Sequence, residues 1–290
     1  MDVELRHLRC LVAIGEEGTV TDAAIALGVS QPAVSRTLAQ LEDRVGARLV
    51  ERSTRRLALT TEGLAFRDEA LRALAAVDDA VAAAYGRVRP LRLGYSWAAA
   101  GEHTNALLRG WRSRHPDVEL QVLRFDDRTA GLASGMVDLA LVRVPIDAPH
   151  VVVEELFVEP RFMAAADDHP LAARRRVRLR DLRHELLAIS SVSGTTTLDL
   201  WPPGEAPAVV VDAGNVDEWL TAIASAQAIG VTAASTAHQH PRPGIAYVRL
   251  SDAPPVATYI AFHDARRHPR QQEFLALARQ VVRSSRPRRR

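Results

Sequence analysis

The chain has 290 residues with 37 basic and 35 acidic side chains, so its formal net charge at pH 7 is only +2. Every basic residue other than histidine is arginine, and the absence of lysine excludes P-loop nucleotide hydrolases, protein kinases and Schiff-base enzymes. A single cysteine, Cys10, excludes an intramolecular disulfide and a zinc site built from several cysteines. With so small a net charge, contact with nucleic acid requires a local basic patch.

The bulk properties are typical of a globular protein with about two domains, one of which can divide into lobes. Hydrophobic residues make up 47% of the chain, and no run of about 18 apolar residues predicts a membrane helix. The N-terminus lacks the basic start and apolar run of a secretory signal. We therefore expect a cytoplasmic location and no membrane partner.

The first sixty residues predict three short helices followed by a hairpin. Apolar residues recur at helical spacing over 5–14, where Cys10 is expected to be a small buried hydrophobic residue. Thr19 precedes the second helical run and Gly28 follows it, which are start and stop signals.

The third helix predicts a face for base contacts. Ser30 stands at its N-cap and Pro32 in its first turn, where proline is tolerated. One apolar stripe contains Val34, Leu38, Leu41 and Val45. The opposite side carries Gln31, Ser35, Arg36, Gln40 and Arg44. Two helices joined by a tight glycine-containing turn, the second with an amide- and arginine-bearing face, are typical of a helix-turn-helix that reads the major groove.

A local excess of arginine follows this helix. Between residues 36 and 56 there are six arginines against three acidic residues, a local balance of +3. The sequence Ser-Thr-Arg-Arg at 53–56 separates two alternating apolar pieces. This pattern predicts a hairpin wing whose tip touches phosphates.

These segments resemble, in order and spacing, the N-terminal signature of the LysR-type transcriptional regulators; the matching blocks are 8–14, 21–27, 29–42, 46–52 and 59–63. Val50 departs from the family, which usually has Phe there. The resemblance implies a winged helix-turn-helix over residues 1–60. The expected DNA-binding residues are Ser30, Gln31, Pro32, Ser35, Arg36 and Gln40 toward the groove, and Arg52, Arg55 and Arg56 toward the backbone. The alternative is a three-helix unit whose charges are merely solvated.

Residues 61–88 predict a long linker helix. Apolar positions step by nearly a heptad through Phe66, Ala70, Leu74, Val77, Val81 and Ala84. A helix of that length, about 40 Å, needs a partner for its stripe. The resemblance implies a homodimer through this helix, which would let two recognition helices read an inverted repeat. The alternative is that the stripe packs on its own C-terminal domain.

From residue 89 to 290 strands alternate with helices, which predicts an α/β domain with a mostly parallel sheet. Expected strands of a first lobe are 91–95, 118–123 and 137–142, with helices at 103–115 and through Leu132 to Gly135. A second series begins at 161–166 and includes 186–189, 208–211, a helix at 216–228, and 245–250. Strand 258–262 and helix 270–283 are expected to return to the first lobe. The predicted bounds are about 91–158 and 256–284 for lobe I, and 161–252 for lobe II.

The resemblance extends into this half at 91–94, 135–141, 169–172, 229–231 and 274–275. It implies two periplasmic-binding-like lobes with a small-molecule effector between them. Gln227 departs from a position that is often Gly in the family, so the shape of the cleft is expected to differ. The overall fold class is thus α/β, with an N-terminal winged helix-turn-helix and a linker helix.

Ligands of open α/β sheets bind beyond the C-terminal ends of strands. The effector-binding candidates are therefore Ser96, Trp97, Thr104, Phe125, Asp127, Arg143, Ser191, Ser193 and Thr195. Arg143 is suited to a carboxylate, and hydroxyl and N–H groups at helix starts are suited to an anion, so an anionic effector is expected. The alternatives are turns and caps for the hydroxyl residues, and a structural ion pair for Arg143.

We find no catalytic constellation, no metal-binding cluster and no cofactor motif, and predict that the chain is not an enzyme. The rival functions are an enzyme, a transport-type solute-binding protein and a sequence-indifferent nucleoid protein. The expected partners are double-stranded operator DNA, an effector, a second copy of the chain with further pairing to a tetramer, and RNA polymerase. The arginine run at 174–176 is expected to be a solvated loop, and the arginine-rich tail at 286–290 to be disordered, with non-specific attraction to phosphate as the alternative. Effector identity, operator sequence and the choice between activation and repression stay open.

Overall fold

The computed structural model describes residues 2–52, 57–86, 88–264 and 267–285. The chain divides into two compact units. The N-terminal unit is Met1–Arg89 with Ser134–Met136, and the C-terminal unit is Pro90–Ala133 with Val137–Arg290. Each unit is described by itself.

Three helices form most of the N-terminal unit: α1 (Leu5–Glu17), α2 (Val20–Leu27) and α3 (Gln31–Val45). Thr19 caps α2 by accepting a hydrogen bond from the backbone N–H of Asp22 at 3.1 Å. All three helices end at a glycine in the left-handed conformation, which side chains disfavour: Gly18, Gly28 and Gly46. The local start and stop signals therefore set the lengths of these helices as predicted.

A small apolar core holds the helices together. Its buried members include Leu11, Ile14, Val34, Leu38, Leu41 and Leu49. Cys10 lies among them with 2% exposure, which confirms the prediction that it is a buried hydrophobic residue. Strand β1 (Val50–Arg52) then pairs antiparallel with β2 (Leu57–Leu59), with Val50 opposite Leu59. Val50 is itself buried in this core, so the smaller residue still packs there.

Helix α4 (Thr61–Ala84) follows the hairpin directly. The Thr60 hydroxyl accepts from the backbone N–H of Gly63 at 2.9 Å and caps the helix. A Cβ atom on Gly63 would stand 2.0 Å from the carbonyl oxygen of Leu49, so only glycine lets the helix start this close to the hairpin. Phe66, the first member of the predicted stripe, packs against the core of α1–α3, whereas Val81 is 51% exposed.

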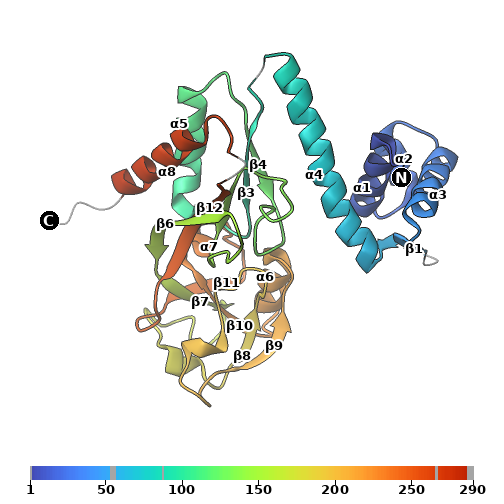
Figure 1. The fold of residues 1–290 in the computed structure, drawn as a ribbon. Helices are drawn as coiled ribbons and strands as arrows, with labels where there is room; N and C mark the ends of the chain where they lie inside the picture. Colours follow the sequence, from blue (N-terminus) through green and yellow to red (C-terminus); the bar gives the residue numbers. More distant parts are fainter. Residues whose placement is uncertain (1, 53–56, 87, 265–266, 286–290) are drawn as a thin grey trace. The chain divides into compact units, whose positions relative to one another are not determined.

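The C-terminal unit contains two five-stranded mixed sheets (Figure 1). The first, in lobe I, has the order β4-β3-β5-β12-β6 and consists of β4 (Leu120–Arg124), β3 (Leu91–Tyr95), β5 (Leu139–Val142), β12 (Val256–His263) and β6 (Val151–Glu159). The second, in lobe II, has the order β11-β7-β10-β8-β9 and consists of β11 (Ile245–Arg249), β7 (Arg161–Ala166), β10 (Ile229–Ala233), β8 (Leu186–Ile189) and β9 (Ala208–Asp212). These sheets confirm the predicted two-lobed α/β class.

Helices α5 (Thr104–Arg114) and α8 (Gln271–Ser285) lie side by side on lobe I, although they are distant in sequence (Figure 1). The short helix η1 (Gly101–His103) leads into α5. The core beneath them includes Leu91, Leu93, Trp111, Leu139, Ile260 and Phe274. Because α8 and β12 come from the C-terminal end of the chain, lobe I is built from two segments, and lobe II lies between them in the sequence.

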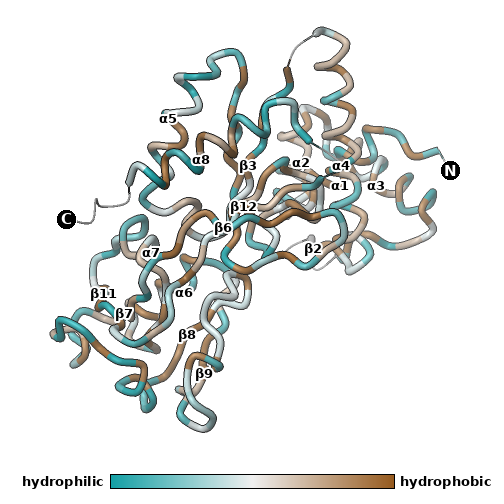
Figure 2. Tube along the Cα trace, turned by 60° about the vertical axis from the view of Figure 1, so that its left-hand side comes forward, coloured by the Kyte–Doolittle hydropathy of each residue, from teal (hydrophilic) through white to brown (hydrophobic). Residues whose placement is uncertain are grey.

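Lobe II carries α6 (Val216–Ala224), α7 (Ala234–Gln239) and the short helices η2 (Leu179–Leu182) and η3 (Leu198–Leu200). Asn215 caps α6 by accepting from the backbone N–H of Glu218 at 2.9 Å. Central strands of both sheets are drawn largely in hydrophobic colours in Figure 2, and several surface loops in hydrophilic ones. The chain enters lobe II at Pro160, between β6 and β7, and returns to lobe I between β11 and β12.

The structure differs from the sequence expectations in three places. The helix predicted through Leu132 is wrong: Ala130 and Gly131 have positive φ angles of 50° and 79°, which interrupt a helical repeat and leave turns. Strand β6 was not predicted at all. The first sheet is mixed rather than mostly parallel, because β12 pairs antiparallel with both β5 and β6. Among the helices within the described ranges, none combines the length and apolar character needed to cross a membrane.

Candidate nucleic-acid interface and effector region

Helix α3 has one buried and one exposed face. Its apolar residues Val34, Leu38 and Leu41 are no more than 2% exposed. On the other side the predicted contact residues Gln31, Pro32, Arg36 and Gln40 are exposed and Ser35 is half-buried. Within the described part of the chain, Arg36 makes no ion pair, so its guanidinium is available to an external acceptor.

The start of α3 leaves polar groups uncommitted. Ser30 is the N-cap residue and has extended backbone angles, but its side chain makes no capping hydrogen bond. The Ser30 hydroxyl is therefore uncommitted at the exposed start of a 15-residue helix, whereas Pro32 has no N–H and the Ala33 N–H donates to the Ser30 carbonyl oxygen at 2.9 Å. Such an N-terminus attracts anions through its free donors and the helix dipole.

Side chains behind α3 fix its position. Glu42 accepts hydrogen bonds from the backbone N–H groups of Leu49 and Val50 at 2.8 and 3.2 Å, which ties α3 to the hairpin. Arg44 contacts the Glu4 carboxylate at 3.2 Å, and this hydrogen bond lowers the pKa of Glu4 below its ordinary value. Contacts near the C-terminal end of α3 thus hold the helix in place and leave its exposed face uncovered.

The basic tip of the predicted wing lies outside the described residues. Arg55 and Arg56 belong to this tip, and the side chain of Arg52 also lies outside the described part of the chain. The backbone of Arg52 pairs with Leu57 in the hairpin.

In the C-terminal unit, Arg143 is the centre of a buried polar network. It follows β5 and is 8% exposed. Its Nη1 donates to the Glu159 carboxylate and to the Thr258 hydroxyl at 2.7 Å. Its Nη2 donates to the carbonyl oxygen of Ala99 at 3.3 Å and to the Ser235 hydroxyl at 2.9 Å. All four terminal N–H groups are engaged, so an effector carboxylate would have to displace one of these acceptors.

Glu159 connects the two lobes through this network. It ends β6 in lobe I and accepts from the backbone N–H and hydroxyl of Ser235 in lobe II, at 2.6 and 2.8 Å. Sequence reasoning missed both residues. The alternation in Val-Val-Val-Glu-Glu-Leu-Phe-Val-Glu at 151–159 is the signal that could have found the strand that carries Glu159. No local pattern marks Ser235 as its partner.

Two further candidates also join the lobes. Trp97, in a left-handed conformation with φ of 65°, donates its indole N–H to the Thr236 hydroxyl at 3.0 Å. Thr104 donates to the carbonyl oxygen of Gly101 and accepts from Gln239 at 3.1 Å. Ser96 is 4% exposed. These candidates are therefore engaged in lobe-to-lobe contacts or buried beside them.

The other effector candidates occupy turns. Asp127 accepts from the backbone N–H groups of Thr129 and Gly131, at 2.7 and 3.1 Å. Phe125 lies against Gly131, and a Cβ there would be 2.7 Å from its ring. In lobe II, the Ser191 N–H donates to Asp212. The hydroxyl oxygens of Ser193 and Thr195 are 3.4 Å apart. In the described part of the chain, no hydrogen bond joins the loop of Ser193 and Thr195 to Arg143.

Arg161 stabilises both places where the chain crosses between lobes. It begins β7, and its guanidinium donates to the carbonyl oxygens of Pro254 at 2.8 Å and of Thr195 at 2.6 Å. Burial lowers the pKa of Arg161 to about 10, which still leaves it charged at neutral pH. Burial also lowers the pKa of His240, whose Nε2 lies 3.4 Å from the Trp97 carbonyl oxygen.

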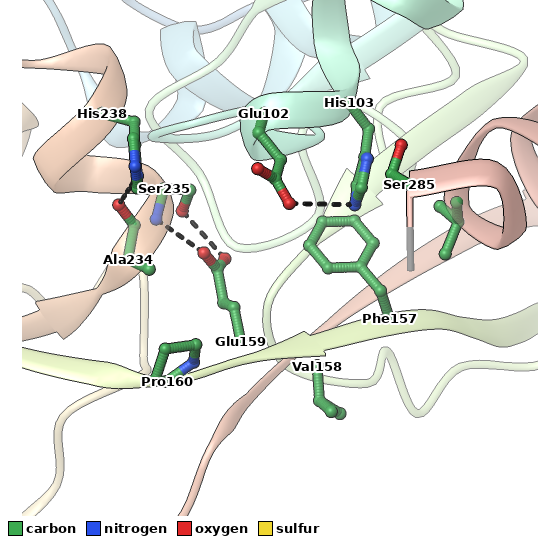
Figure 3. A pocket seen from close by; sticks show the side chains of 11 residues that line it. Glu102, His103, Phe157, Val158, Glu159, Pro160, Ala234, Ser235, His238 and Ser285 are labelled. Carbon is green, nitrogen blue, oxygen red and sulfur yellow. Dashed lines mark hydrogen bonds and ion pairs between the residues drawn. The ribbon is translucent and has the colours of Figure 1, made fainter. Parts of the chain in front are cut away.

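A pocket of about 390 Å³ opens beside the network, within the size range of small-molecule sites. Figure 3 shows Glu102 and His103 of η1 on one side and Glu159 and Ser235 on the other. The remaining lining residues are Phe157, Val158, Pro160, Ala234, His238, Val282 and Ser285. The pocket therefore draws on both lobes and on the last turn of α8.

Two runs of arginine lie in the C-terminal half of the chain, at 174–176 and 286–290. Arg174, Arg175 and Arg176 are exposed on lobe II, in agreement with the expectation that they are solvated. Residues 286–290 lie outside the described residues.

Two family models match the chain. Residues 5–64 match the bacterial regulatory helix-turn-helix protein model of the lysR family. Residues 86–283 match the LysR substrate binding domain. Together they cover both the exposed face of α3 and the two lobes.

Curated relatives carry regulator names. The uncharacterized regulator YnfL of Escherichia coli is 36% identical over 64% of this chain, and the match spans 65% of its own length, just under two thirds. A probable hydrogen peroxide-inducible genes activator of Mycobacterium xenopi is 38% identical over 60% of this chain and 95% of the relative. The regulator TfdS of Cupriavidus pinatubonensis is 29% identical over 96% and 98% of the two chains.

Solved structures share the fold. The LysR family regulator CbnR superposes with a TM-score of 0.72 at 23% identity, over 97% of this chain and 99% of that one. Full-length CbnR complexed with its target DNA gives a TM-score of 0.66 at 24% identity, over 98% and 100%. At these identities the likeness is one of fold alone.

Proposed function

The chain belongs to the LysR family, and from this premise we propose that it is a sequence-specific DNA-binding transcriptional regulator whose activity depends on a small-molecule effector. The observation that carries the proposal is the exposed polar face of α3, whose Arg36 has no ion-pair partner in the described chain. The relatives are named as regulators rather than enzymes, which supports the prediction that the chain is not an enzyme. We place its action in the cytoplasm.

Each part of the N-terminal surface has its own role in DNA binding. Arg36 pairs with guanine, and Gln31 and Gln40 with adenine, in the major groove. Ser30 binds a phosphate, because its hydroxyl makes no capping hydrogen bond and the positive end of the α3 dipole lies beside it. Pro32 and Ser35 lie on the same face, and Arg52, Arg55 and Arg56 bind the backbone from the wing.

We further propose that two copies pair through α4. Three large side chains on or just after this helix are exposed to solvent: Leu64 by 45%, Val81 by 51% and Tyr85 by 74%. Pairing with a second copy would remove this apolar surface from water. A dimer would place two recognition helices on an inverted repeat, and further pairing would give a tetramer that also contacts RNA polymerase.

The effector acts on the C-terminal unit, through the hydroxyl and N–H groups of Ser96, Thr104, Ser191, Ser193 and Thr195, with Trp97, Phe125, Asp127 and Arg143 beside them. Redox sensing by a thiol is excluded there, because Cys10 of the N-terminal core is the only cysteine. A ligand shifts activity only if it binds two states of the lobes unequally.

The test is binding of the purified chain to the intergenic DNA beside its own gene, with unlabelled competitor and a salt series. Arg36→Ala should weaken specific binding by a factor of about 5–150, equivalent to about 1–3 kcal/mol for a base contact. Arg109→Ala is the matched control, since Arg109 is an exposed arginine of α5 in the other unit.

Two outcomes would count against the proposal. Equal competition by any DNA would leave only non-specific electrostatic attraction. An equal loss of affinity in Arg36→Ala and Arg109→Ala would show that α3 is not the recognition element.

A further inference from the structure

The pocket beside the interlobe network has a consistent chemistry that none of the matched families or relatives assigns. Of its lining residues, the charged ones are Glu102 and Glu159, and no arginine is among them. Glu159 is neutralised by Arg143. The carboxylate of Glu102 is 69% exposed, and Nε2 of the His103 ring lies 3.9 Å from it. Within the described chain, the pocket therefore has an excess of negative charge.

The hydroxyl groups on its wall already donate their protons inside the protein. Ser235 donates to Glu159 at 2.8 Å, and Ser285 donates to the carbonyl oxygen of Val281 at 3.1 Å. A hydroxyl has one proton but two lone pairs, so the capacity left to Ser285 is that of an acceptor.

The two histidines extend this acceptor character. His238 Nδ1 lies 2.8 Å from the carbonyl oxygen of Ala234, which can only accept, so Nδ1 carries the proton and Nε2 of the neutral ring is an acceptor. His103 is 7% exposed, and its Nδ1 has no hydrogen-bond partner in the described chain. Its Nε2 is turned toward Glu102 (Figure 3).

The rest of the wall is apolar. Phe157 packs edge-on against His103, with ring centroids 4.7 Å apart, and Val158, Pro160 and Val282 continue the surface. A ligand that fits must therefore combine an apolar body with a group rich in donors and positive in charge.

We propose that this pocket binds a small primary amine, in its ammonium form, with an aromatic or branched apolar body. The ammonium group donates to Glu102, the acceptors on His238 and Ser285 stand on either side of it (Figure 3), and the apolar part covers Phe157 and Val282. The site is separate from the strand-end positions at which an anionic effector is expected. The proposal concerns binding alone, and it stands or falls independently of DNA recognition.

The experiment is isothermal titration calorimetry of the full chain at pH 7.5 with three probes of equal shape: benzylamine, benzyl alcohol and benzoate. We expect benzylamine to bind at least about tenfold more tightly than benzyl alcohol, and benzoate not to bind at this site. Amide chemical-shift changes should gather on η1, α7 and the end of α8.

Four variants locate the effect. Glu102→Gln should weaken benzylamine binding by about fivefold or more, since it removes the charge and keeps the shape. Glu205→Gln, at an exposed acid of lobe II, is the matched control and should bind like the wild type. His103→Phe keeps the ring contact with Phe157 while it removes both ring nitrogens. A chain ending at Ser285 tests whether the arginines of 286–290 compete for the site.

Benzoate binding as tightly as benzylamine would overturn the proposal, because it would show an anion site. So would unchanged benzylamine affinity in Glu102→Gln, shift changes elsewhere in the chain, or no binding of benzylamine at millimolar concentration.

Discussion

The two units of this molecule differ in whether their key polar side chains are exposed to solvent or buried against one another. In the N-terminal unit, Ser30, Gln31 and Arg36 stand exposed on a helix whose other face is buried. In the C-terminal unit, Arg143, Glu159 and Ser235 are each less than a tenth exposed and satisfy one another. The first arrangement reserves donors and acceptors for an external partner. The second uses them to connect the lobes, so that a change there alters the unit itself.

Because of this difference, we expect the buried polar side chains to determine stability and the exposed ones to determine recognition. An exposed polar side chain without a partner adds little to folding and can be removed at little cost. A buried charge that loses its partner is strongly destabilising. The following changes test that division, beginning with the largest expected effect.

Glu159→Ala should lower the free energy of unfolding of the C-terminal unit by about 3–5 kcal/mol, because it leaves Arg143 buried without a counter-charge. Arg36→Ala should leave the unfolding midpoint nearly unchanged. Denaturant unfolding followed by circular dichroism measures both. Adding Arg143→Met to Glu159→Leu should recover part of the loss, since an apolar pair no longer buries a charge. Similar losses for Glu159→Ala and Arg36→Ala would break the comparison.

Gly63→Ala tests whether the stability of the N-terminal unit depends on a close backbone contact as well as on side chains. The new Cβ would stand 2.0 Å from the Leu49 carbonyl oxygen, so α4 must move and about 1–3 kcal/mol of stability should be lost. Gly15→Ala is the control, because its Cβ would meet the movable end of the Leu59 side chain. Thermal unfolding should separate the two variants; equal midpoints would mean that the contact between α4 and the hairpin is not tight.

Removing a helix cap should lower the free energy of unfolding by a similar amount in both units. Thr19→Ala in α2 and Asn215→Ala in α6 each remove one side-chain acceptor for a backbone N–H. We expect a loss of about 1 kcal/mol in each case. Unfolding curves of the two single variants and of the double variant measure this, and additive losses would show that the two caps do not interact energetically.

Cys10 gives the smallest effect and depends on pH. Burial raises the pKa of its thiol to about 11, from an ordinary value of 9.0. The folded chain keeps the proton while the unfolded chain releases it, so this contribution to stability is complete below pH 9 and is lost as the pH rises toward 11. Unfolding of wild type and Cys10→Ala between pH 7.5 and 10 measures the difference; a gap that does not change with pH would contradict it.

The helix-turn-helix could be predicted because its determinants are local. Glycines 18, 28 and 46 end the three helices, Thr19 starts one of them, and residues three and four apart fix which side of α3 is buried. The same reasoning failed near Leu132, where left-handed residues Ala130 and Gly131 produce turns. There the hydrogen bonds of Asp127 outweigh helical propensity.

The sequence by itself thus determined the two-part organisation, the exposed polar face of α3 and the absence of thiol chemistry in the lobes. Only the tertiary structure decided that Arg143 pairs with Glu159, 16 residues away, and with Ser235, 92 residues away. The same holds for the pocket, which gathers residues from η1, β6, α7 and α8. The physical reason is that helical periodicity acts over a few residues, whereas a buried charge must find its partner wherever the fold places one.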